Sequence, residues 1–117
     1  MHARRLAFSI LALAAAGAAG AHAHAFLDHA SPLVGSTVSA PREVRMWFTQ
    51  SLEPKFSGAQ LRSSGGAVVG SGHVDGADSK EIVIPVRSLA PGQYKVIWKV
   101  LSVDTHRTEG SFGFEVK

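Results

Sequence analysis

The sequence predicts an all-β domain, a small antiparallel sandwich or barrel. Three observations favour this fold class. Apolar and polar residues alternate at every second position, glycine and proline separate the alternating segments, and no segment shows the period of an amphipathic helix. The 117 residues suffice for one small domain. The chain contains no cysteine, so we expect its apolar core to stabilise it without disulfides.

The first segment, residues 1–23, has the features of an export signal in the expected order. Arg4 and Arg5 supply a positive start, an apolar run follows, and small residues then repeat in the A-x-A pattern that signal peptidase accepts. We expect residues 1–23 to be removed and residues 24–117 to form the domain. Because the last three A-x-A patterns all lie where the apolar run ends, three cleavage points stay open, after Ala21, Ala23 or Ala25.

Cleavage changes the charge balance of the protein. The whole chain carries a formal net charge of +3, and the loss of Arg4 and Arg5 reduces it to +1. The remaining charges are scattered along the sequence, which argues against a nucleic-acid partner. No second apolar run follows the signal, so we expect a cleaved protein that does not span the membrane, and we expect a monomer.

The alternating segments predict the strands in order. The predicted strands are residues 42–50, 57–63, 81–86, 94–102 and 109–117. The residues predicted to face the core are Val44, Met46, Phe48, Tyr94, Val96, Trp98, Val100, Phe112, Phe114 and Val116. Pro85 indicates an edge or a bulge in its strand, because proline lacks the N–H that a central strand needs. Residues 70–80 are polar and rich in glycine, which predicts a loop.

Asp104 and His106 stand two residues apart in the sequence SVDTH. On an extended backbone both side chains would leave the same face, roughly 7 Å apart along the strand. A carboxylate and an imidazole at that separation reach one metal ion at ligand distances of about 2 Å. The same residues also fit an ordinary polar turn after a strand, so the spacing alone leaves both interpretations open.

Cleavage after Ala23 would make His24 the first residue of the exported chain. Its free amine and its ring would then form a small chelate, which suits a metal with square-planar preference, Cu(II) above all. With Asp104 and His106 the donor set becomes three nitrogens and one oxygen. The amine must lose its proton to bind, and its ordinary pKa is about 7.7 to 8.0, so we expect the affinity to fall in acid.

The other two cleavage points predict different outcomes. Cleavage after Ala21 would place His24 third, an arrangement that binds Cu(II) through backbone amides and needs nothing from the folded domain. Cleavage after Ala25 would make Phe26 the first residue and would remove both arrangements.

From His24 onward the chain resembles the CopC family of periplasmic copper-resistance proteins. The shared motifs are the opening histidine followed by Pro32 and Gly35, the FSGA motif at 56–59, YKVIW at 94–98 and SVDTH at 102–106. The resemblance implies a small Greek-key β-barrel of the immunoglobulin-like or cupredoxin-like kind. It also implies one Cu(II) ion per chain, bound by His24, Asp104 and His106, and it supports cleavage after Ala23.

The resemblance further implies a role in copper resistance and homeostasis rather than catalysis. The protein would sequester copper in the periplasm or deliver it to an inner-membrane partner of the CopD type. Some members bind Cu(I) through a methionine-rich segment, but this chain has only Met1 and Met46, and soft Cu(I) requires several sulfurs. Gln50 replaces an acid found in some members. We interpret His29 as an exposed strand residue and His73 as a solvated loop residue.

Two further functions are compatible with the sequence. A terminal histidine and a second histidine on copper also describe the histidine-brace sites of enzymes that cleave polysaccharides oxidatively. Asp104 as an equatorial ligand would disfavour oxygen activation there. The second alternative is an exported β-sandwich interaction module that binds no metal.

Overall fold

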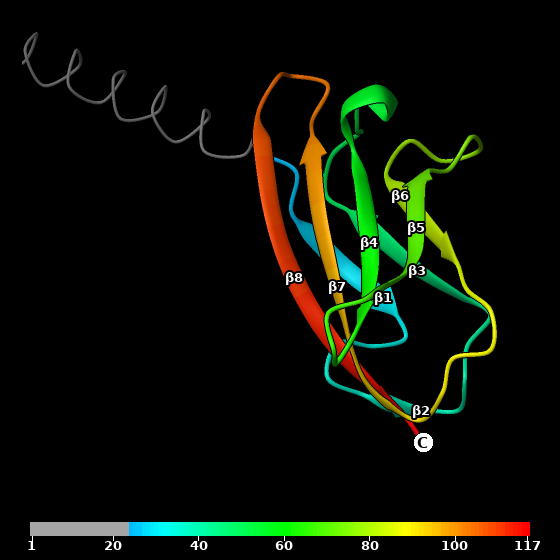
Figure 1. Ribbon diagram of the computed structural model, residues 1–117. Coiled ribbons are helices and arrows are strands. Elements are labelled where there is room, and N and C mark those ends of the chain that lie inside the picture. The colour runs from blue at the N-terminus through cyan, green and yellow to red at the C-terminus, as the bar shows by residue number, and fades with distance from the viewer. Residues whose placement is uncertain (1–23) are drawn as a thin grey trace, which may run out of the picture.

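One eight-stranded sheet, curled into an open half-barrel, forms the fold in the computed structural model, which describes residues 24–117 (Figure 1). The predicted signal peptide, residues 1–23, lies outside the described residues. The elements are β1 (Leu27–Ser31), β2 (Thr37–Val38), β3 (Glu43–Phe48), the 3₁₀ turn η1 (Pro54–Phe56), β4 (Gly58–Ser63), β5 (Val68–Val74), β6 (Glu81–Pro85), β7 (Gly92–Leu101) and β8 (Arg107–Val116).

The strand order is β1-β3-β6-β5-β4-β7-β8-β2. Every pair is antiparallel except β2 with β8, which is parallel. In Figure 1, β5, β4, β7 and β8 form one layer, and β1, β3 and β6 cross behind it. The all-β prediction is confirmed. The antiparallel prediction fails only for the short β2, which runs alongside the end of β8.

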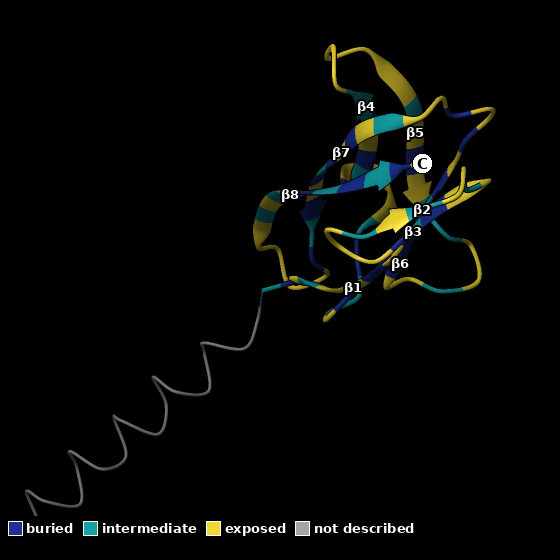
Figure 2. Cartoon of the chain, turned by 90° about the horizontal axis from the view of Figure 1, so that it is seen from below, coloured by how far each residue is buried: buried dark blue, intermediate teal, exposed yellow. Residues whose placement is uncertain are grey.

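The apolar core lies between the two layers, and Figure 2 shows buried residues along the strands, with exposed residues on the connections and on β2 and β5. Burial alternates along β7 as the period-two pattern predicts. All ten residues predicted to face the core are buried, and Met46 and Val96 have no exposed surface. The lysines on the other face of β7, Lys95 and Lys99, are exposed.

The prediction of a loop over residues 70–80 is wrong for its first part, because residues 70–74 belong to β5. The glycines in this part of β5 are required by its close packing against β6. A Cβ atom on Gly72 would lie 2.5 Å from the carbonyl oxygen of Val83 and 2.6 Å from the side chain of Ile84. β5 therefore approaches β6 more closely than a side chain allows, and the glycine-rich composition that suggests a loop marks a close strand crossing.

Pro85 ends β6, opposite Glu43 of β3. On the other side of β6 the pairing with β5 extends only to Val83. The strand is therefore a local edge at Pro85, in agreement with the prediction from proline.

One end of the half-barrel contains η1 and the turn in which the predicted site residues Asp104 and His106 lie. η1 and the β7–β8 turn lie at this end, opposite β2 and the C-terminus (Figure 1). A bridge between Leu52 and Ser102 joins the two segments, and the amide of Glu53 donates to the carbonyl of Leu101 at 2.8 Å. Within residues 24–117, no helix has the length and apolar character needed to cross a membrane.

Candidate metal centre

The segment from His24 to Phe26 is held in place by two threonines. The Thr49 hydroxyl accepts a hydrogen bond from the Phe26 amide at 3.0 Å and lies 3.4 Å from the His24 carbonyl, to which it donates. The Thr108 hydroxyl donates to the carbonyl of Ala25 at 2.5 Å, and Ala25 has no exposed surface. Because Thr49 follows β3 and Thr108 lies in β8, this segment bridges the two layers of the sheet.

The β7–β8 turn places Asp104 and His106, and Ser102 organises it. Ser102 is fully buried. Its hydroxyl donates a hydrogen bond to a carboxylate oxygen of Asp104 at 2.5 Å and accepts one from the backbone amide of His106 at 3.3 Å. Thr105 has a φ of +72°, the left-handed conformation that lets the chain reverse. Asp104 and His106 therefore do not lie on the extended backbone that the spacing argument assumed, but in a tight turn.

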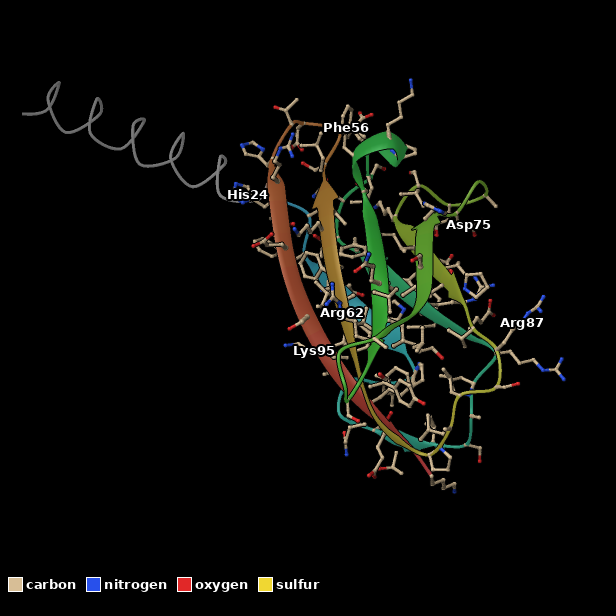
Figure 3. All side chains as sticks on the ribbon, viewed as in Figure 1. His24, Phe56, Arg62, Asp75, Arg87 and Lys95 are labelled. Atoms are coloured by element: carbon tan, nitrogen blue, oxygen red, sulfur yellow. The ribbon has the colours of Figure 1, made fainter. Side chains whose placement is uncertain are left out.

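The fold brings His24 and His106 together. Their rings are stacked with centroids 4.5 Å apart and planes 23° apart. The ring of Phe26, which is 53% exposed, lies 6.0 Å from that of His24. Two imidazoles from opposite ends of the described chain thus meet beside the β7–β8 turn. Figure 3 shows His24 at this end of the molecule.

Asp104 is exposed, and its surroundings favour the carboxylate form. The hydrogen bond from Ser102 lowers the pKa of Asp104 below its ordinary value of 3.8, against a smaller opposing effect of desolvation. Electrostatic attraction to His106 and His24 lowers the pKa further. These interactions place a negative charge beside the histidine pair.

The three predicted ligands do not form a ready-made coordination sphere. Among residues 24–117, no group of three or more histidine, cysteine, aspartate or glutamate side chains is arranged to hold a metal ion. Stacked rings present their faces rather than their nitrogens to each other, and Asp104 is bonded to Ser102. The structure thus pairs two of the three predicted ligands, His24 and His106, while Asp104 bonds to Ser102 in the β7–β8 turn.

The other two histidines considered lie on strands. His29 is exposed on β1, as predicted, where its ring stacks on Trp47 at 4.4 Å and bonds to Asp28 at 2.7 Å. His73 is exposed on β5, opposite Gly58 of β4, and not in a loop. Gln50 is half-buried directly after Thr49.

Sequence analysis missed the three hydroxyl residues that hold the centre, Thr49, Ser102 and Thr108. A threonine or serine at a strand end is common, and no spacing marks these three as partners of a distant segment. The S-x-D-T-H motif did contain Ser102, but its role in bonding Asp104 depends on the reversed turn.

The fold and this end of the sheet define a class: small all-β domains that carry a pair of histidines at one end as a candidate metal site. Comparison with known proteins narrows that class. The family model of the CopC domain matches residues 27–117. The chain is 36% identical over 123 residues to copper resistance protein C of Xanthomonas campestris pv. juglandis, with 97% of each chain covered.

Solved structures of two copper resistance proteins are also similar to this chain. CopC from Methylosinus trichosporium OB3b superposes with a TM-score of 0.75 at 33% identity, covering 80% of this chain and 94% of that one. PcoC, a methionine-rich copper resistance protein from Escherichia coli, superposes with a TM-score of 0.73 at 36% identity, covering 81% of this chain and all of that one. The chain belongs to the CopC family of copper resistance proteins, as its motifs predicted, and its function is related to copper.

Proposed function

We propose that the protein binds one Cu(II) ion in the periplasm and either sequesters it or delivers it to a membrane partner, without catalysis. The observation that carries this proposal is the contact between the rings of His24 and His106 at one end of a CopC domain. Imidazole nitrogens suit Cu(II), and the carboxylate of Asp104 adds an oxygen and a compensating charge.

The proposal assigns four donor atoms to three residues. They are the amine and ring nitrogens of His24, a ring nitrogen of His106 and a carboxylate oxygen of Asp104. In the 117-residue chain the backbone nitrogen of His24 is part of a peptide bond, and its lone pair is delocalised into the carbonyl, so it is not an amine donor. Cleavage after Ala23 would turn it into an amine, so export would complete the donor set.

Cu(II) fits the chain better than Cu(I). PcoC is methionine-rich, whereas this chain has two methionines. Met1 belongs to the predicted signal peptide, and Met46 has no exposed surface within the core. No thioether among residues 24–117 is therefore accessible to a soft cation, and nitrogen and oxygen donors favour the divalent ion.

A titration with Cu(II) tests the proposal. The chain beginning at His24 is titrated in competition with a chelator, and one tight site is expected. His24→Ala and His106→Ala should each weaken binding at least about a hundredfold, because each removes nitrogen donors, while circular dichroism stays unchanged. His29→Ala and His73→Ala are matched controls that should leave the affinity within about twofold.

Wild-type affinity in both ligand variants would overturn the proposal. A reductant-driven oxidation of polysaccharide by the copper-loaded chain would overturn its non-catalytic part.

A further inference from the structure

The charges of the protein are unevenly divided over its surface. Residues 54–74 and 92–101, which contain η1, β4, β5 and β7, have no aspartate or glutamate. Their lysines and arginine are Lys55, Arg62, Lys95 and Lys99. The other half of the sheet and its connections contain the carboxylates Asp28, Glu43, Asp75, Asp78 and Glu81. Figure 3 shows Arg62 and Lys95 along the β4 and β7 side and Asp75 beyond β5. The net charge is small, but the face formed by η1, β4, β5 and β7 carries positive charges only; we call it the cationic face.

This face is hollowed where one residue lacks a side chain. Gly58 lies between His73 of β5 and Lys99 of β7 in the register of the sheet. Both neighbours are exposed, so their side chains flank the gap over Gly58. The resulting hollow has a volume of about 560 Å³, and Lys55 and Phe56 contribute to its walls.

The cations around the hollow have no carboxylate partner at contact distance. The ion pairs closer than 4.0 Å in residues 24–117 join His29 to Asp28 and Arg45 to two glutamates, so none involves the cationic face. One carboxylate, Glu109 of β8, lies opposite Lys99 in register. Glu53 directly precedes η1, but neither Glu53 nor Glu109 lines the hollow. The lysines that line the hollow, Lys55 and Lys99, make it attractive to an anion.

We infer that this hollow is a docking site for an acidic segment of a partner protein, whose carboxylates bind between Lys55 and Lys99. Its position supports the inference, since Phe56 at the rim is 59% exposed and lies at the same end of the molecule as His24 (Figure 3). The docked partner would thus lie near the candidate metal centre. As a step in copper delivery, the inference rests on the proposed function.

The shape of the face favours a protein segment over a membrane. The lining of the hollow combines the small residues Gly58, Ser71 and Gly72 with the longer side chains of Lys55, His73 and Lys99. A flat layer of lipid headgroups would meet the long side chains that flank Gly58, whereas an extended chain can lie between them. An extended acidic chain fills a hollow of this size, which is within the roughly 300–1,000 Å³ of ordinary ligand pockets.

The test is an NMR titration of the copper-free exported chain with an acetylated, amidated octaglutamate peptide. The amide signals of Gly58, His73 and Lys99 should shift with octaglutamate and stay unmoved with octaglutamine. Because no copper is present, a failure of docking and a failure of Cu(II) binding are separate results.

Matched variants make the test specific. The double variant Lys55→Glu/Lys99→Glu should weaken octaglutamate binding at least about tenfold. Lys80→Glu/Arg87→Glu changes the net charge equally on the other half of the sheet and should keep the affinity within about twofold. Glu109→Gln should strengthen binding, since it removes the carboxylate opposite Lys99.

Equal losses in the two double variants would overturn the inference, because binding would then follow net charge alone. Vesicles with 30% phosphatidylglycerol supply the other comparison. Binding of the chain to these vesicles through the hollow, without octaglutamate binding, would assign the face to a membrane and also overturn it.

Discussion

Thr108 fixes the segment after His24, because its hydroxyl donates a hydrogen bond to the carbonyl of buried Ala25. Thr108→Val keeps the shape of the side chain but removes the donor, which leaves a buried carbonyl unpaired at a cost of about 1–3 kcal/mol. We expect faster hydrogen exchange at Phe26 and roughly tenfold weaker Cu(II) binding. The measurements are exchange by NMR and a chelator competition.

Thr37→Val is the control for this variant. Thr37 also donates a hydroxyl hydrogen bond, to Glu115, but it lies in β2 at the opposite end of the half-barrel. It should leave Cu(II) affinity unchanged. Equal effects of the two variants would show that Thr108 does not position the N-terminal segment.

Ser102 gives a second prediction, because its hydroxyl lowers the pKa of Asp104. A lowered pKa stabilises the fold at pH values above the ordinary 3.8, and this contribution is lost as the pH falls through the lowered value. Ser102→Ala should therefore raise the pKa of Asp104 and reduce this acid dependence. The titration of the Asp104 carboxyl carbon, followed by NMR in the copper-free chain, measures the shift. An unchanged pKa would contradict the account of the turn.

At the scale of elements, β5 depends on the absence of a side chain at Gly72. Gly72→Ala would place a Cβ atom 2.5 Å from the Val83 carbonyl oxygen. A backbone atom within a sheet cannot move far enough to relieve this clash. We expect a loss of about 1–3 kcal/mol in the free energy of unfolding, as for overpacked cores. Gly65→Ala, where no atom lies within 4 Å of the added carbon, should change stability little. Urea unfolding measures the free energy of unfolding of both variants, and equal values would contradict the role given to Gly72.

The elements also show what the sequence does and does not predict. Period-two alternation predicts β3 and β7 with their buried faces, because one side of each strand meets the core and the other meets water. It fails at β5, where glycines permit a close strand crossing and produce the composition of a loop. The two-residue spacing marks Asp104 and His106 as candidates but leaves an extended backbone and a polar turn both open. The structure has the turn, with Thr105 in a conformation that its residue type disfavours.

For the molecule as a whole, the half-barrel places three features at one end: the first described residue, the β7–β8 turn and η1. His24 thereby meets His106, and the hollow beside Phe56 lies nearby. The sequence alone predicts the histidines as ligands through a family resemblance, but it does not show that their rings touch. That contact depends on the pairing of distant strands.

The central claim is that export makes the His24 nitrogen a copper ligand together with His106. The most direct measurement is the EPR spectrum of the chain beginning at His24, loaded with one equivalent of Cu(II). We predict a tetragonal spectrum with coupling to three nitrogens. Adding a methionine before His24 should abolish this spectrum, because the amine moves away from the ring. An identical spectrum from the extended chain would contradict the account.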